Sequence, residues 1–114
     1  MPLTTDKKRI LVISNDPLIM DSIRVVINAQ KDMEWVDPIP EGKDLLVELA
    51  MQSPDVILLD YAYQKKGFFE LVDKITTAYP GSALIVILPE NEMVNSERII
   101  LAGARAFLVT PFKQ

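Results

Sequence analysis

Short aliphatic runs alternate along the chain with stretches in which apolar residues recur every three or four positions. Four of these runs are ILVI (10–13), DVILLD (55–60), ALIVIL (83–88) and AFLV (106–109). Three of them are nearly continuous Ile, Leu and Val, which is typical of strands covered on both faces of a parallel sheet. A weaker strand is predicted around residues 34–39, at an edge of the sheet or at its own end, because Pro38 cannot donate to a strand ladder.

The segments between the strands have the spacing of amphipathic helices. The first helix is predicted to begin at Pro17, with Asp16 as its N-cap, because Pro suits the first helical position and Asp accepts from the exposed N–H groups there. The predicted helices run from Pro17, over 43–51, from about Phe68 to the YPG sequence at 79–81, and over 92–102 before Gly103. Their recurring apolar positions are Ile19, Ile23, Val26 and Ile27, then Leu45, Leu46, Leu49 and Ala50, then Phe68, Leu71, Val72 and Ile75, then Val94, Ile99 and Ile100.

Strand and helix therefore alternate until a fifth strand, after which only TPFKQ remains. This order predicts an α/β fold with a five-stranded parallel sheet sandwiched by helices, but without a fifth helix. A chain of 114 residues is sufficient for one domain, here residues 1–114. Because a parallel strand needs cover on both faces, we expect either that the domain is the N-terminal piece of a longer protein or that another chain covers the open side.

Composition excludes several kinds of chemistry. The chain has no Cys and no His, which rules out disulfides, thiolate catalysis, Cys/His zinc sites and a catalytic His in these residues. Its 12 Lys and Arg against 16 Asp and Glu give a net charge of −4, which argues against nucleic-acid binding. The one basic run, Lys7-Lys8-Arg9, is interpreted as a solubilising lead-in to a strand. No segment has the length of a signal peptide or a membrane span, so we expect a cytoplasmic protein without membrane insertion.

Asp60 ends the most apolar strand, which places its carboxylate at the carboxyl edge of the sheet, where ligands are usually held. A carboxylate there is a candidate nucleophile for aspartyl phosphate formation. The equally weighted alternative is that Asp60 only caps the following loop. No Ser lies in a recognisable nucleophile motif and no Gly-rich loop is present, so catalysis by this chain alone is not expected.

In this order and spacing, ILVISNDP, SPDVILLDY, ALIVILPE and AGARAFLVTPF resemble the receiver domain of two-component response regulators, over residues 9–112. The resemblance implies a doubly wound, flavodoxin-like sheet of order 2-1-3-4-5. It also implies a Mg²⁺ site built from an acidic pair and the phosphoacceptor Asp, with a Thr or Ser and a Lys that bind the phosphoryl oxygens.

Carried over position by position, the acidic pair falls on Ser14 and Asn15, the acceptor on Asp60, the hydroxyl on Leu88 and the Lys on Thr110. Only the acceptor is retained, and Asp16 lies one step beyond the pair. The resemblance therefore predicts a degenerate receiver without a bound metal or other cofactor, in which phosphorylation of Asp60 is slow or absent.

The leading hypothesis is a non-catalytic module that binds a protein partner or forms a homodimer. The AGARAFLVTPF ending resembles the N-terminal domain of the CpaE/TadZ pilus-assembly ATPases, which implies a role in localising or dimerising such an ATPase. One alternative is a phosphorylated receiver that uses Asp60 with an atypical Mg²⁺ site of Asp16 and Asn15. Another is a small-ligand sensor in the crevice of Ser14, Asn15 and Thr110.

Two further expectations concern the end of the chain. Thr110-Pro111 aligns with a Lys-Pro step that is commonly cis in receivers, which predicts a cis bond here. The missing fifth helix should leave the fourth helix and fifth strand open for association. The residues expected at this surface are Ile99, Ala102, Phe107 and Val109, with Leu108 beside them.

Overall fold

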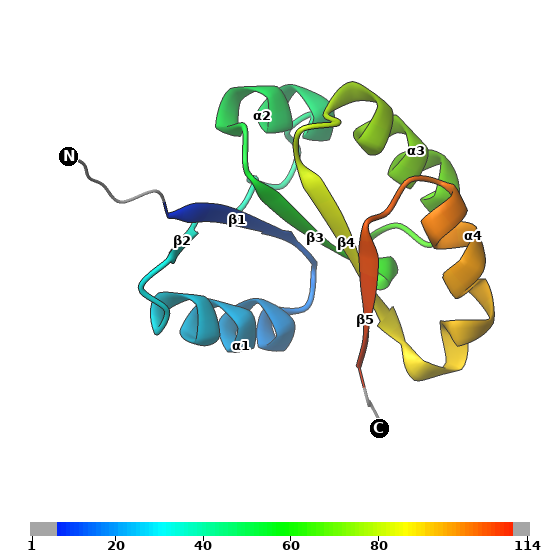
Figure 1. The fold of residues 1–114 in the computed structure, drawn as a ribbon, viewed down its shortest axis with the longest axis horizontal. Coiled ribbons are helices and arrows are strands. Elements are labelled where there is room, and N and C mark those ends of the chain that lie inside the picture. The colour runs from blue at the N-terminus through cyan, green and yellow to red at the C-terminus, as the bar shows by residue number, and fades with distance from the viewer. Residues whose placement is uncertain (1–6, 111–114) are drawn as a thin grey trace.

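The computed structural model describes residues 7–110, which form a five-stranded parallel sheet with helices on both faces (Figure 1). The strands are β1 (Lys8–Ile13), β2 (Met33–Trp35), β3 (Val56–Asp60), β4 (Ala83–Pro89) and β5 (Ala106–Thr110). The α-helices are α1 (Pro17–Asn28), α2 (Leu45–Gln52), α3 (Phe68–Ala78) and α4 (Ser96–Leu101). The strand order β2-β1-β3-β4-β5, parallel throughout, confirms the predicted doubly wound α/β fold.

Side chains at the helix starts explain where the first two helices begin. Asp16 accepts a hydrogen bond from the Leu18 N–H over 2.9 Å, and Pro17 follows as the first helical residue, as predicted. The second helix begins at Leu45 rather than at residue 43, because Asp44 accepts from the backbone N–H groups of Leu46 and Val47 and is thus the N-cap.

The fourth helical segment differs from its prediction. Residues Glu90–Asn95 form a 3₁₀ helix, η2, and the α-helix begins only at Ser96. A 3₁₀ helix has three residues per turn, so the apolar positions before and after Ser96 do not share one face. Ile99 is buried as predicted, whereas Val94 is 85% exposed and Ile100 is also exposed, so their predicted burial was wrong. Ala50 of the shorter α2 is likewise exposed.

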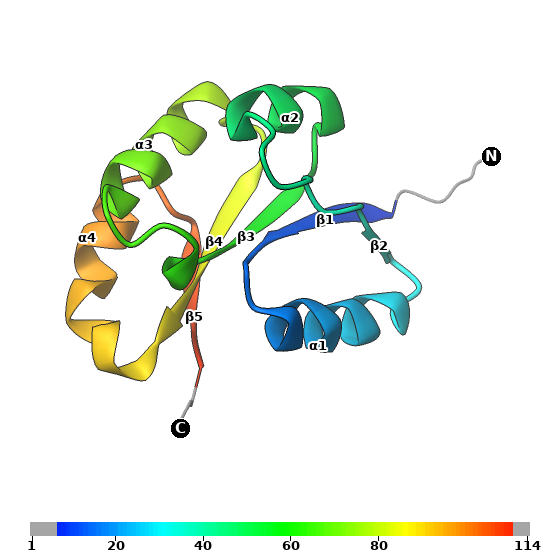
Figure 2. The same cartoon turned by 180° about the vertical axis from the view of Figure 1, so that it is seen from behind.

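Figure 2 shows α1 on one face of the sheet and α2, α3 and α4 on the other. A layer of core side chains lies on each face. The larger layer packs α2, α3 and α4 against the sheet, and its fully buried side chains include Leu11, Leu49, Ile57, Leu59, Phe68, Val72, Ile75, Leu84, Val86, Leu88 and Ile99. The smaller layer lies under α1 and consists of Ile10, Val12, Ile27, Leu58 and Ile87, with partly buried residues around it. The domain therefore has one well-covered face and one face that α1 covers only in part.

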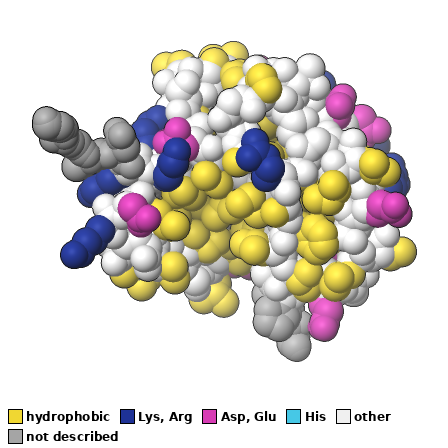
Figure 3. Space-filling model, viewed as in Figure 1, with side chains coloured by type: hydrophobic (Ala, Val, Ile, Leu, Met, Phe, Trp, Pro, Cys, Tyr) yellow, Lys and Arg dark blue, Asp and Glu magenta, His cyan; other side chains and the backbone are white. Residues whose placement is uncertain are grey.

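The incompletely covered face is visible as a gathering of apolar side chains between α1 and β5 (Figure 3). Ile85 of β4 is only partly buried there, and Leu108 of β5 is 51% exposed. The predicted absence of a fifth helix concerns residues after Thr110, which lie outside the described residues. The Thr110-Pro111 bond, predicted to be cis, lies outside the described residues.

The basic run at the start of β1 has a structural role at Arg9. Its guanidinium donates hydrogen bonds to the carbonyl oxygens of Gln52 and Ser53, and its backbone N–H donates to Asp55 Oδ2 over 2.8 Å. These contacts join the end of α2 to β1. Between residues 7 and 110, no helix combines the length and the apolar character that crossing a membrane requires.

Candidate phosphoacceptor site

A cavity of about 640 Å³ lies at the carboxyl edge of the sheet, where the loops after β1, β3 and β4 meet the end of β5. Parallel strands end at the same edge, which explains why residues far apart in the sequence come together here. The cavity is lined by Asn15, Asp16, Pro17, Ile19, Asp60, Tyr61, Ala62, Lys65, Pro89, Asn91, Glu92 and Thr110. Of the six predicted pocket residues, Asn15, Asp16, Asp60 and Thr110 line it directly.

Asp60 is held by hydrogen bonds at both carboxylate oxygens. Ser14 Oγ donates to Asp60 Oδ2 over 2.7 Å, and the Ala62 N–H donates to Asp60 Oδ1 over 3.2 Å. Asp60 is only 4% exposed. The second of these bonds caps the short 3₁₀ helix η1 (Tyr61–Tyr63), so the capping role predicted for Asp60 is present. The position of Asp60 at the end of β3 also agrees with a role as phosphoacceptor. The geometry permits either role.

The residues beside Asp60 do not fit Mg²⁺. Oxygen ligands with negative charge suit this ion best, yet Ser14 supplies a neutral hydroxyl that already donates to Asp60, and Asn15 supplies at most a neutral carbonyl. The carboxylate of Asp16 accepts from the Leu18 N–H as a helix cap. Among the described residues, no three Asp, Glu, His or Cys side chains form a group that could hold a metal ion.

Leu88, the position carried over for the family's hydroxyl residue, does not reach the cavity. Its side chain is fully buried in the larger core layer. Side chains alternate between the faces of a strand, and the neighbouring residue Pro89 lines the cavity instead. Leu88 therefore does not line the cavity, and neither Leu88 nor Pro89 has a hydroxyl group.

Thr110 was predicted to occupy the family's Lys position. It pairs with Pro89 across β4 and β5, and its Oγ1 atom is buried without a hydrogen-bond partner among residues 7–110. The exposed Lys65 lines the cavity from the loop after η1. Sequence reasoning missed Lys65, because it lies in a polar loop whose course the hydrophobic pattern does not reveal.

Tyr61 and Glu92 form the outer part of the cavity and were also not predicted. Burial raises the pKa of Tyr61 above its ordinary value of 10.0, and the Glu92 carboxylate raises it further through its charge and a hydrogen bond. Asn95 Nδ2 donates to Glu92 Oε1 over 2.8 Å. Glu92 and Asn95 both belong to η2, and Tyr61 belongs to η1.

Comparison with protein families identifies the family of this chain. A family model described as the response regulator receiver domain matches residues 10–114. The chain belongs to the response regulator receiver family. Similar proteins include the uncharacterized transcriptional regulatory protein YxjL of Bacillus subtilis, 28% identical over 104 residues. A protein-glutamate methylesterase/protein-glutamine glutaminase of Thiobacillus denitrificans is 28% identical over 106 residues.

This receiver chain spans only part of those relatives. The matches cover 91% and 92% of the chain but 46% of YxjL and 30% of the methylesterase. Among solved structures, the receiver domain of a response regulator from Bacteroides fragilis has a TM-score of 0.79 at 17% identity, covering 94% of this chain and 87% of that one. A CheY-like protein (tadZ) from Pseudomonas aeruginosa has a TM-score of 0.72 at 17% identity, covering 94% and 90%. These structural matches support the fold.

The predicted interface residues of this receiver have different environments. Ile99 is completely buried, so it cannot itself contact a partner. Ala102 and Phe107 are partly buried against the larger core layer, while Val109 is exposed. The exposed apolar residues of α4 are Ile100 and Leu101, of which Leu101 is 79% exposed. The surface of α4 and β5 is therefore apolar, but Ile99 contributes to it only by supporting α4 from beneath.

Proposed function

We propose that this receiver domain is a cytoplasmic protein-interaction module that does not operate as a phosphorylation switch. The observation that supports this most directly is the hydrogen bond from Ser14 Oγ to Asp60 Oδ2. In the family the position of Ser14 belongs to the acidic pair that holds Mg²⁺. Here the same position holds the acceptor carboxylate through a neutral hydroxyl group.

Electrostatics give the expected size of this change. Two unit charges 4 Å apart interact by about 4 kcal/mol at an effective dielectric constant of 20. The replacement of two family carboxylates by Ser14 and Asn15 removes two such attractions for a divalent cation. With Thr110 in place of Lys, this position also supplies no positive charge to a phosphoryl group. We therefore expect Mg²⁺ affinity no better than millimolar and no useful phosphorylation of Asp60.

Treatment with Mg²⁺ and a small phosphodonor, followed by intact-mass measurement, tests this proposal. We expect no added phosphoryl group on the wild-type chain. The variant S14D/N15D/T110K restores the acidic pair and the Lys, although not the hydroxyl at position 88, and should gain a phosphoryl group that is lost again when Asp60→Asn is added. A receiver with both acids in the same mixture verifies the donor. Phosphorylation of the wild-type chain contradicts the proposal.

The alternative function, a receiver that accepts phosphate on Asp60, is favoured by one observation: Asp60 lies at the strand end beside the cavity, as in an active receiver. It requires Mg²⁺ to be held with Asp16 and Asn15. If Asp16 serves as a metal ligand, Asp16→Asn should abolish phosphorylation while leaving helix α1 capped, because Asn is also a good N-cap. A phosphorylated wild type that is inactivated by this change supports the alternative.

We further propose that this domain precedes a pilus-assembly ATPase in the same protein and localises or dimerises that ATPase. Support comes from the resemblance of AGARAFLVTPF to the CpaE/TadZ ending and from the fold-level match to the CheY-like tadZ protein. Determining the coding sequence beyond Gln114 provides the test. A downstream phosphate-binding loop of the ATPase type supports the proposal, whereas a helix-turn-helix DNA-binding domain contradicts it.

A further inference from the structure

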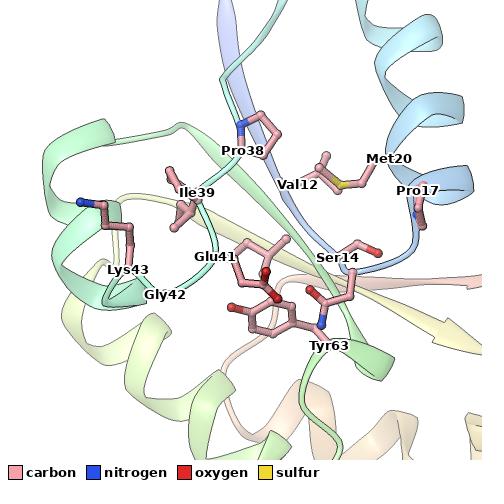
Figure 4. Close-up of a pocket in the computed structure, with 13 residues that line it drawn as sticks. Val12, Ser14, Pro17, Met20, Pro38, Ile39, Glu41, Gly42, Lys43 and Tyr63 are labelled. Carbon is pink, nitrogen blue, oxygen red and sulfur yellow. The ribbon is translucent and has the colours of Figure 1, made fainter.

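A second hollow, of about 370 Å³, lies beside the Asp60 cavity at the same edge of the sheet. It is bounded by α1 and by the loops after β1, β2 and β3 (Figure 4). Only Asn15 and Pro17 line both cavities. Ser14 lines this hollow and donates to Asp60, which lines the other, so the Ser14–Asp60 hydrogen bond lies between them.

One part of the lining is apolar. It consists of Val12, Ile13, Pro17, Met20, Pro38, Ile39 and Pro40. Three of these residues are prolines, whose ring fixes one backbone torsion, so the wall loses little conformational freedom when a ligand binds. Such a surface suits a short aliphatic group.

The other part of the lining carries polar side chains without partners. Within residues 7–110, the side chains of Asn15, Glu41 and Tyr63 make no hydrogen bond, and Glu41 makes no ion pair. All three have oxygen atoms that can accept from a ligand. A cavity with an apolar wall and a few polar groups is the usual form of a small-molecule site.

Glu41 and Lys43 are the charged residues of the lining. Glu41 is the acidic residue of the lining, and Figure 4 shows its side chain among the lining residues, whereas Lys43 extends away from them. Lys43 also borders a different hollow between α2 and α3. The net charge of −4 of the whole chain adds to the attraction for a cation.

We infer that this hollow binds an aliphatic ammonium group, with the ammonium at Glu41, Asn15 and Tyr63 and the aliphatic part against Val12 and Met20. The ligand is small, because a volume of 370 Å³ corresponds to about a dozen water molecules at about 30 Å³ each. A free amine and a lysine side chain of a partner protein share this chemistry. The inference does not depend on whether Asp60 is phosphorylated.

Titration of the ¹⁵N-labelled chain with butylammonium chloride at constant ionic strength tests the inference. We expect saturable shifts of the backbone amide signals of Asn15, Gly42 and Tyr63. Butanol and butyrate have the same chain length without the positive charge and should give much weaker shifts. No saturable shift at tens of millimolar, or equal binding of butyrate, overturns the inference.

Two charge-removing variants locate the ammonium group. Glu41→Gln should weaken butylammonium binding roughly threefold or more, the effect of losing one exposed ion pair. Glu34→Gln removes the same charge from β2, outside the hollow, and should leave binding unchanged. Equal binding by Glu41→Gln and wild type, with an unchanged native spectrum, overturns the assignment of Glu41.

The source of the ammonium group is tested with a blocked lysine, N-acetyl-lysine methylamide, and its uncharged counterpart N-acetyl-norleucine methylamide. Tighter binding of the blocked lysine than of butylammonium identifies a lysine side chain of a protein partner. Tighter binding of butylammonium identifies a free amine. If the norleucine compound binds as well as the lysine compound, the positive charge is irrelevant and the inference is wrong.

Discussion

Ser14 Oγ donates a hydrogen bond of 2.7 Å to Asp60 Oδ2 at the neighbouring carboxyl ends of β1 and β3. The two residues are 46 positions apart in the chain, so this bond also joins two strand ends of the sheet. A buried carboxylate needs hydrogen-bond donors, and Asp60 has two, Ser14 and the Ala62 N–H. Ser14 therefore has a structural role at Asp60.

Ser14→Ala should destabilise the domain by about 1–3 kcal/mol, because it leaves one oxygen of a buried carboxylate without its donor. Urea denaturation followed by circular dichroism measures the free energy of unfolding. Ser22→Ala, on the exposed side of α1, is the matched control and should leave stability unchanged or slightly higher. If both variants are equally stable, Ser14 does not support Asp60.

Gly103→Ala should destabilise by about 2–4 kcal/mol, because it combines a strained backbone with a steric clash. Gly103 has a φ of +118°, and a Cβ there would overlap Thr76 Oγ1 and lie 2.9 Å from Thr76 Cβ. Thr76 Oγ1 donates to the Val72 carbonyl over 2.9 Å and lies 3.2 Å from the Ala102 carbonyl, so these contacts hold it in place.

Gly81→Ala is the control for this change. Gly81 has nothing within 4 Å of its would-be Cβ, so the same substitution should change stability by no more than about 0.5 kcal/mol. The same urea measurement applies to both glycine variants. Equal effects at positions 81 and 103 would mean that the Thr76 contact is unimportant.

Alkaline pH should lower stability in part through Tyr61. Its pKa is raised in the folded chain by burial and by Glu92, so the folded state keeps the phenol proton more tightly than the unfolded state. The resulting stabilisation is fully present below the ordinary pKa of 10.0 and is lost as the pH rises through the higher folded value. Tyr61→Phe should flatten this alkaline loss in urea denaturation at successive pH values; an unchanged loss contradicts the assignment.

The strands could be predicted from the sequence because their burial on both faces leaves an almost continuous aliphatic pattern. Leu11, Ile57 and Val86 all lie in the core as this pattern requires. The fourth helix was predicted less well, because a 3₁₀ segment changes the angle between successive side chains and reverses the exposure of Val94.

The residues of the site could be predicted only where they lie at the end of a strand or directly after it. Asp60 and Thr110 both line the cavity at the predicted edge. Leu88 is buried in the core instead, and its neighbour Pro89 lines the cavity, because one step along a strand moves a side chain to the opposite face. Lys65 and Glu41 lie in loops. Their positions depend on the course of the backbone, which apolar periodicity does not specify.

The last prediction concerns association through α4 and β5. Leu101 and Val109 are exposed aliphatic residues of this surface, and covering apolar area contributes about 25 cal/mol per Å². We expect sedimentation velocity at several concentrations to show reversible self-association of the chain. Leu101→Glu and Val109→Glu should each weaken it at least about tenfold, because a charge would have to be buried in the contact.

Met51→Glu is the matched control, because Met51 is 73% exposed on α2, away from this surface. It introduces the same charge and should leave association unchanged. Equal weakening by all three variants would show that added negative charge alone causes the effect. If the wild-type chain stays monomeric at every concentration, no second copy covers the apolar surface of α4 and β5, and the prediction is wrong.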